Sequence, residues 1–302
     1  MTVLRTPEER FANLPGFDFE PHYLEIDGGE VGPLRMHYLD EGPADGPVVA
    51  LVHGEPTWSF MFRDSIGPLV SAGFRTVVPD LVGFGRSDKP AEIGDYSYER
   101  HVAWLKDFFG ILQVQDVVLV GHDWGGLLGL RLLTEVEGLV RAYVATNHGY
   151  PTGDLPANEA LSQWQEFAAS SPVFEIGSIV DNACTTDLAE EVVAAYDAPF
   201  PDDTFKAGTR AFPRLIPVTP DDPSSDAVRR SREVLGQWQG RFLTVYGEQD
   251  PIAGPADAMF QQLVPGAAGM PHARLAGAGH NMPEDAGETL GELVARFAGD
   301  RS

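Results

Sequence analysis

Short apolar runs constrain the fold of this chain more than any other feature of its sequence. They end at Gly, Asp or Pro and alternate with longer segments of helical periodicity. Runs of Val and Leu of this length are typical of strands buried on both faces, as in a parallel sheet. The sequence therefore predicts an α/β fold with a mostly parallel, doubly wound sheet. The runs are Val48–Val52, Thr76–Val78, Val117–Val120, Ala142–Ala145 and Phe242–Tyr246.

The segments around these runs predict the helices and one edge of the sheet. Helical periodicity covers Ser59–Ala72, Tyr98–Leu112 and Trp124–Thr134. Hydrophobicity alternates residue by residue over His22–Ile26 and Leu34–Asp40, which indicates an antiparallel hairpin. We expect this hairpin to lie at the edge of the sheet.

The α/β rhythm stops after Asn147 and resumes near Gly240. The intervening segment has no strand-like run and is rich in proline turns between helical stretches. We therefore expect an α/β core made of residues 1–150 and 230–302, into which a helical cap, residues 151–229, is inserted. The helical stretches of the cap are Asn158–Ala169, Leu188–Tyr196 and Phe205–Phe212.

The charge balance limits the partners of the chain. It has 45 acidic against 21 basic residues and a net charge of -24. Such a surface repels phosphate backbones and anionic membranes, so we expect neither nucleic acid nor membrane as a partner. No uncharged apolar run approaches the roughly 18 residues of a membrane span, and the first residues lack the apolar core of a secretory signal. The single cysteine, Cys184, excludes an intramolecular disulfide. We expect a cytoplasmic protein that is a monomer or a small homo-oligomer.

Residues 119–129, LVGHDWGGLLG, have the pattern of a nucleophile elbow, a sharp strand-to-helix turn that presents a reactive side chain between glycines. The usual occupant is Ser or Cys, but here it is Asp123. A carboxylate is a weak nucleophile toward amides. It attacks well at a saturated carbon that carries a good leaving group or belongs to a strained ring, and the product is an alkyl ester. The elbow therefore predicts a covalent ester of Asp123.

Two further residues complete a triad in chain order. Asp250 follows the run Phe242–Tyr246, and His280 follows a further short strand-like segment. The order nucleophile, acid, histidine is that of α/β-hydrolases. His280, oriented by Asp250, would take a proton from the water that hydrolyses the ester. This chemistry needs no metal and no organic cofactor.

The loops after the strands supply the remaining candidates. Backbone N–H groups of Glu55, in HGEPTW at 53–58, and of Trp124 are the expected oxyanion hole. The indole of Trp124 is a donor with no acceptor capacity, so it can hold a departing halide but cannot protonate an alkoxide. The glycines of residues 80–88 lack a following Gly-Lys-Ser/Thr, which favours a structural turn over a phosphate loop.

At this point the chain resembles haloalkane dehalogenases of the α/β-hydrolase fold. The resemblance rests on residues 53–58, on 80–88 and on GHDWGG at 121–126, and it covers nearly the whole chain. It implies Asp123 as nucleophile, Asp250 as acid, His280 as base and Trp124 as a halide donor. It also implies a small apolar halogenated substrate and water, with an alcohol and a halide ion as products.

The resemblance also points to one branch of this family. Many members carry a halide-donating Asn at the position of Glu55, and members without it use a cap tryptophan, a position that Trp164 resembles. The alternative place for the acid, at Asn147, has no carboxylate, which favours Asp250. Residues 281–283, Asn-Met-Pro, depart from the aromatic and aliphatic pair that relatives usually have, so the cavity near them is expected to differ.

Two other functions remain open. An epoxide hydrolase on the same fold would need cap tyrosines to protonate the leaving alkoxide, and Tyr150 and Tyr196 are the candidates. A non-catalytic ligand-binding homologue could lose a member of the triad freely, and this chain keeps Asp123, Asp250 and His280. Haloalkane dehalogenation is the function that we expect.

Overall fold

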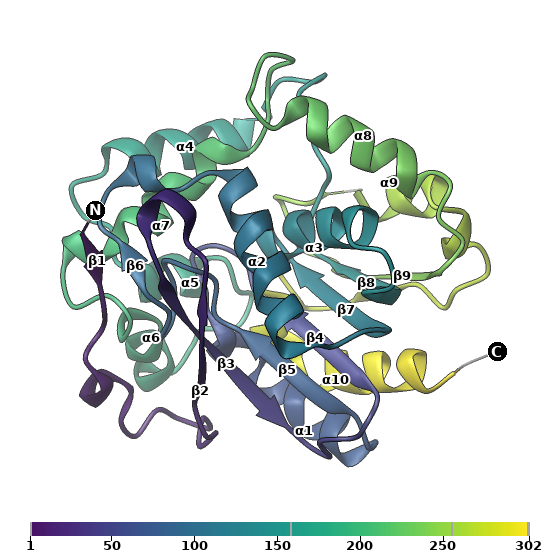
Figure 1. Cartoon of the computed structure of the whole chain (residues 1–302), viewed down its shortest axis with the longest axis horizontal. Helices are drawn as coiled ribbons and strands as arrows, with labels where there is room; N and C mark the ends of the chain where they lie inside the picture. The colour runs from purple at the N-terminus through teal and green to yellow at the C-terminus, as the bar shows by residue number, and fades with distance from the viewer. Residues whose placement is uncertain (1, 158, 255, 301–302) are drawn as a thin grey trace.

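The computed structural model describes residues 2–157, 159–254 and 256–300. Met1, Arg301 and Ser302, which belong to the expected core, and Asn158, the expected first residue of a cap helix, lie outside the described residues. The described part contains a sheet of eight strands in the order β10-β9-β8-β7-β4-β5-β3-β2 (Figure 1). Its strands are β2 (His22–Ile26), β3 (Leu34–Glu41), β4 (Val48–Val52), β5 (Arg75–Pro79), β7 (Val117–His122), β8 (Val140–Thr146), β9 (Arg241–Gly247) and β10 (Ala273–Leu275).

The directions of the strands confirm the predicted sheet. The strands β5, β4, β7, β8, β9 and β10 pair in parallel, while β2 and β3 are antiparallel and form the expected hairpin at one edge. β3 also pairs antiparallel with β5. The central strand β7 is buried along its whole length, as its continuous apolar run indicates.

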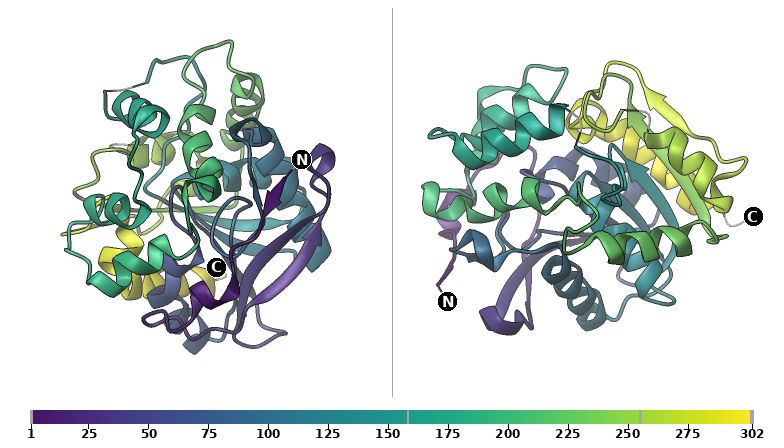
Figure 2. Two further views of the ribbon diagram at one scale, coloured as in Figure 1. Left: turned by 90° about the vertical axis from the view of Figure 1, so that its left-hand side faces the viewer. Right: turned by 90° about the horizontal axis from the view of Figure 1, so that it is seen from above.

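Helices cover both faces of this sheet. α1 (Arg63–Ser71) and α10 (Met282–Gly299) pack on each other on one face, and α2 (Tyr98–Leu112), α3 (Trp124–Glu135) and α8 (Ser225–Leu235) lie on the other, with α9 (Ala256–Leu263) beside β9 (Figures 1 and 2). The sequence sets the ends of α2: the Ser97 hydroxyl accepts from the Arg100 N–H, and Gln113 adopts a left-handed conformation after the last turn.

The segment between β8 and β9 is helical, as predicted. It contains α4 (Glu159–Ser170), α5 (Ile176–Asn182), α6 (Glu190–Asp197) and α7 (Ala207–Ala211), which gather beyond one end of the strands (Figure 1). α5 is not among the predicted helices. α7 is shorter than predicted because 3₁₀ turns flank it on both sides, and Pro213 stands in the second turn. α8 runs without a break across residue 229, so the chain returns to the sheet through a helix.

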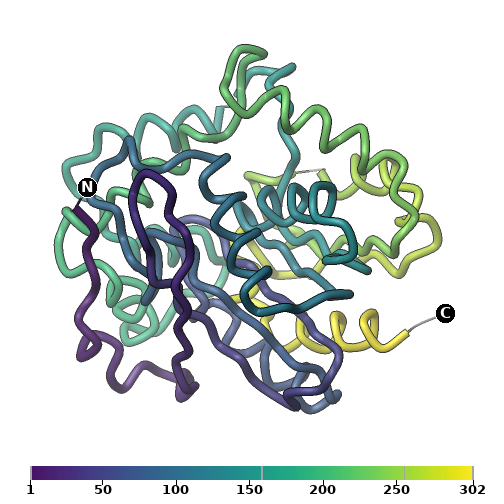
Figure 3. Tube along the Cα trace, viewed as in Figure 1, coloured from purple at the N-terminus to yellow at the C-terminus, as the bar shows by residue number. Residues whose placement is uncertain are grey.

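The N-terminal segment lies against the cap (Figure 3). β1 (Val3–Leu4) pairs with β6 (Lys89–Pro90) in a second, two-stranded sheet. Next to it the Thr6 hydroxyl donates to Pro199 O at 2.6 Å, and the Arg10 guanidinium donates to Ala198 O at 3.0 Å. The N-terminal segment is therefore hydrogen-bonded to the residues that directly follow α6. None of the helices in the described part of the chain has the length and apolar character that a membrane crossing requires.

Candidate active site

Asp123 stands at the turn between β7 and α3 with backbone angles of φ 48° and ψ -120°. A positive φ is unusual for a residue with a side chain, and at such elbows the strain presents the side chain to the cavity. The glycines of the motif allow the close packing that this turn needs. A methyl group at Gly125 would collide with the carbonyl oxygen of Val52 in β4. The close packing of α3 against β4 therefore requires a glycine at position 125 of the elbow.

The loop after β4 holds one oxygen of the nucleophile. The Glu55 N–H donates to Asp123 Oδ1 at 2.9 Å. Gly54 makes this approach possible, because a side chain there would overlap the Asp123 carboxylate. In the described part of the chain, the backbone N–H of Trp124 makes no hydrogen bond to this carboxylate. The structure therefore has one of the two expected oxyanion donors in contact with Asp123.

His280 joins the other two predicted triad residues. Its Nδ1 lies 3.1 Å and 3.2 Å from the two carboxylate oxygens of Asp250, and its Nε2 lies 3.6 Å from Asp123 Oδ2. The first pair fixes the ring, and the second nitrogen faces the nucleophile. The residues come from the ends of β7, β9 and β10, which meet at one edge of the parallel sheet.

The charges of the three residues support one another. Burial opposes ionisation of Asp250, but His280 and the N–H groups of Ile252 and Ala253 outweigh it and lower the pKa of Asp250 to about 2. Burial likewise opposes a charge on His280, yet the two carboxylates raise its pKa to about 10. His280 also lowers the pKa of Asp123 against the effect of burial. The two carboxylates therefore favour the protonated form of His280 in the free site.

Asn147 is a residue of this site whose contribution the sequence analysis missed. Its Nδ2 donates to Asp250 Oδ2 at 2.9 Å and to Gly279 O at 3.0 Å, and its Oδ1 accepts from the Gly247 N–H at 3.1 Å. The sequence pattern pointed to position 147 only as an alternative position for the triad acid, where Asn147 has no carboxylate. The signal that could have identified it is a polar side chain directly after a buried strand, on the edge where the catalytic residues gather.

The two tryptophans predicted to bind halide line one cavity of about 500 Å³. Asp123, Glu55 and His280 line the same cavity. The Trp124 indole is buried against Phe212. The Trp164 indole, from α4, donates its N–H to Glu55 Oε2 at 3.3 Å, so in this structure the cap donor is bound to a side chain of the core.

Glu55 thus has a side chain inside the cavity as well as its backbone donor. The residue is only 7 % exposed, and its second oxygen, Oε1, has no hydrogen-bond partner among the described residues. Burial and the neighbouring charge of Asp123 raise the pKa of Glu55 well above its ordinary value. Both effects favour the protonated, neutral form of this carboxyl group.

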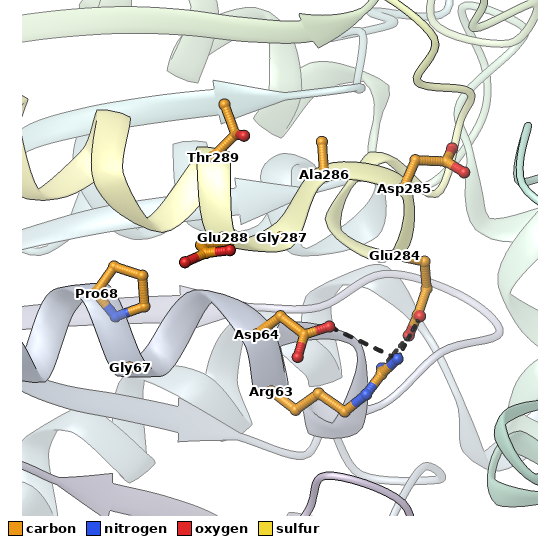
Figure 4. A pocket seen from close by; sticks show the side chains of 10 residues that line it. All are labelled: Arg63, Asp64, Gly67, Pro68, Glu284, Asp285, Ala286, Gly287, Glu288 and Thr289. Atoms are coloured by element: carbon orange, nitrogen blue, oxygen red, sulfur yellow. Dashed lines mark hydrogen bonds and ion pairs between the residues drawn. The ribbon is translucent and has the colours of Figure 1, made fainter.

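The tyrosines that an epoxide hydrolase would need are engaged elsewhere. The Tyr150 hydroxyl is hydrogen-bonded to Ser231 Oγ, and the Tyr196 hydroxyl donates to Glu284. Glu284 also receives the Arg63 guanidinium, with Nη2 at 2.7 Å, in the pocket between α1 and α10 (Figure 4). Each phenol is therefore hydrogen-bonded to a residue outside the triad. The described residues also contain no group of three or more His, Cys, Asp or Glu side chains arranged to hold a metal ion.

Curated proteins similar in sequence to this chain include haloalkane dehalogenases. Residues 47–285 match the family described as alpha/beta hydrolase fold. The chain is 49% identical over 294 residues to a haloalkane dehalogenase of Mycolicibacterium paratuberculosis, with 97% of each chain covered. It is 44% identical over 300 residues to one of Psychrobacter cryohalolentis, with 99% of each covered.

Solved structures that are similar to this one include haloalkane dehalogenases as well. The tetrameric haloalkane dehalogenase DpaA from Paraglaciecola agarilytica superimposes with a TM-score of 0.87 at 34% identity, covering 100% of this chain and 99% of that one. The dehalogenase DbeA from Bradyrhizobium elkani gives a TM-score of 0.78 at 25% identity, covering 93% and 97%. The chain therefore belongs to the haloalkane dehalogenase family of the α/β-hydrolase fold.

Proposed function

We propose that this chain hydrolyses small apolar haloalkanes to an alcohol, a halide ion and a proton, through an alkyl ester of Asp123. One observation carries the assignment of roles: Asp123 faces the His280–Asp250 pair inside the cavity that Trp124 and Trp164 also line. The helices between β8 and β9 serve as the cap over this cavity, and we keep residues 151–229 as its extent.

In the first step, Asp123 Oδ2 attacks the carbon that bears the halogen. The new C–O bond forms as the carbon–halogen bond breaks, and the halide leaves with the bonding electrons. Trp124 donates its indole N–H to the halide, and the Trp164 N–H moves from Glu55 to the same ion. The Glu55 N–H keeps Oδ1 in place, which leaves Oδ2 free to react.

In the second step, His280 Nε2 takes a proton from water, and the water oxygen attacks the carboxyl carbon of the ester. The negative charge on Oδ1 is stabilised by the Glu55 N–H and by the Trp124 N–H, which completes the oxyanion hole in this state. The intermediate then expels the alkoxide, which takes the proton from His280, and the carboxylic acid loses its proton to solvent.

The electrostatics of the site support this order of steps. The Asp123 carboxylate is one of the charges that raise the pKa of His280 to about 10. Alkylation removes that charge, so the pKa of His280 falls when the ester has formed. The imidazolium then gives a proton to solvent, and the neutral imidazole is a base at the stage where a base is needed.

Halide release from 1-bromobutane and 1,2-dibromoethane, measured beside hydrolysis of styrene oxide, tests the proposal. We expect halide release from the bromoalkanes and no diol. Formation of diol without halide release would instead assign an epoxide hydrolase. For the assembly, we propose a small homo-oligomer, because the related DpaA is tetrameric; light scattering of the purified chain tests this.

A further inference from the structure

The loop that carries His280 lies against a segment of the cap, residues 180–186. The Asn281 N–H donates to Ala183 O at 3.1 Å, and the Asn281 side-chain amide donates to Val180 O at 3.1 Å. Asn281 is 3 % exposed, so both bonds are shielded from water. The sequence departure at position 281 thus supplies a buried link between the catalytic loop and the C-terminal end of α5.

Asp285 makes a second link between the same two segments. Its carboxylate accepts from the N–H groups of Thr185 and Thr186 in the cap, each at 3.0 Å, and from the Gly279 N–H at 2.8 Å. Figure 4 shows Glu284 directed at Arg63 while Asp285 points away from that ion pair. One carboxylate therefore joins the cap to the residue that directly precedes the base.

Gly279, the residue before His280, is held from two sides. Its carbonyl oxygen accepts from the Asn147 side chain of the core, and its N–H donates to the Asp285 carboxylate. A methyl group at Gly279 would lie 2.9 Å from Ala183 O, so the cap segment touches the backbone at this point. A displacement of the cap segment would therefore act directly on the position of the base.

The same cap segment forms part of the cavity wall. Asn182, Ala183, Cys184 and Thr185 line the cavity with Asp123 and His280. The nucleophile, in contrast, is held by the elbow and by the Glu55 N–H, and both belong to the core. Opening the cavity at this segment would thus disturb the base while leaving the nucleophile in place.

We propose that Asp285 and Asn281 are positioning residues that couple the cap to the base, so that His280 reaches the ester only while residues 180–186 are docked. The inference rests on the proposed function, because it assigns the coupling to the second chemical step. Alkylation of Asp123 proceeds independently of this contact. Hydrolysis of the ester is confined to the closed cavity.

Rapid mixing with 1,2-dibromoethane, followed by acid quenching and intact-mass analysis, separates the two steps. In Asp285→Asn an amide NH₂ replaces one acceptor oxygen and faces a backbone N–H. We expect the first release of bromide at the wild-type rate, a turnover reduced roughly 10-fold, and accumulation of the alkylated protein. Asp222→Asn is the matched control, because the Asp222 carboxylate likewise accepts from two backbone N–H groups, those of Val218 and Thr219, but elsewhere in the cap; it should behave like the wild type.

Several outcomes decide the proposal. Equal slowing of both steps in Asp285→Asn, or wild-type turnover without accumulated ester, would overturn it. If thermal melting shows that Asp285→Asn does not fold, Asn281→Ala carries the test, and absence of ester accumulation there overturns the proposal equally. A wild-type protein that forms neither bromide nor ester would instead refute the proposed function, which is a distinguishable result.

Discussion

The two sides of the cavity around Asp123 are built differently. On the side of the base, Asp250 Oδ1 accepts from the N–H groups of Ile252 and Ala253, and Oδ2 accepts from Asn147. All these partners belong to the core. On the halide side, a cap residue, Trp164, meets Glu55 through one bond of 3.3 Å, and Glu55 Oε1 has no partner among the described residues.

This difference shows which contacts of the site exist before the substrate binds and which are still open to a ligand. The hydrogen bonds of Asp250 are satisfied by the core before any substrate arrives, so folding fixes the orientation of the acid. A buried polar atom without a partner costs about 1–3 kcal/mol, which a fold does not tolerate without a reason. We infer that the hydrogen bonds of the halide side are completed by its ligand. Substitutions on the two sides should therefore fail in different ways.

The largest effect is expected on the base side, from His280→Phe. Loss of the base stops hydrolysis but leaves the attack by Asp123, so each protein should release one halide and then stall. Steady-state turnover should fall by about 10²–10⁴-fold. Intact-mass spectrometry should show an increase equal to the alkyl group. Asp123→Ala is the control and should gain no mass, and normal turnover in His280→Phe would contradict the assignment of the base.

On the halide side, Trp164→Phe keeps the ring and removes the N–H donor. A hydrogen bond to a charged group contributes about 1.5–3 kcal/mol, so bromide should bind roughly 10- to 100-fold more weakly. Quenching of indole fluorescence by bromide measures this affinity. Trp238→Phe, a half-buried indole packed on Phe242, is the control. An unchanged bromide response in Trp164→Phe would remove this residue from the site.

The difference between contacts within the core and contacts with the cap also explains which features the sequence could predict. The strand runs, the edge hairpin and the meeting of Asp123, Asp250 and His280 follow from local periodicity and from chain order, because strand ends converge on one edge of a parallel sheet. α5 was missed because its seven residues are too few for a clear helical period. The bond between Trp164 and Glu55 joins residues 109 positions apart and depends on how the cap docks.

Asn147 gives a further test of the base side, because it supports Asp250 from the core. Asn147→Gly removes the side chain while tolerating the observed φ of 50°. The Gly247 N–H and Asp250 Oδ2 each lose a bond, so the free energy of unfolding should fall by about 1–3 kcal/mol and turnover by roughly 10-fold. Urea unfolding and steady-state rates measure the two effects. Asn13→Gly, at an exposed residue with a φ of 59°, is the control and should change neither; a stable, fully active Asn147→Gly would show that Asp250 needs no such support.

The smallest effect, and the one most specific to the halide side, is expected from Glu55→Gln. Burial and Asp123 raise the pKa of Glu55, while His280 opposes the shift. Below this raised pKa the side chain is neutral; above it, a carboxylate shares the cavity with the halide and repels it. Wild-type affinity for bromide should therefore decrease as the pH rises through that pKa. Glutamine keeps an oxygen that can accept from Trp164 but cannot ionise, so at neutral pH the affinity should change by only about 2- to 3-fold.

A bromide titration of both proteins from about pH 6 to about pH 10 measures the difference. His280, with its pKa raised to about 10, also loses charge toward the end of this range and weakens halide binding in both proteins. The part of the pH dependence that disappears in Glu55→Gln therefore belongs to Glu55. Identical slopes in the two proteins would mean that Glu55 carries no charge change in this range, and that the unpartnered Oε1 does not influence the halide.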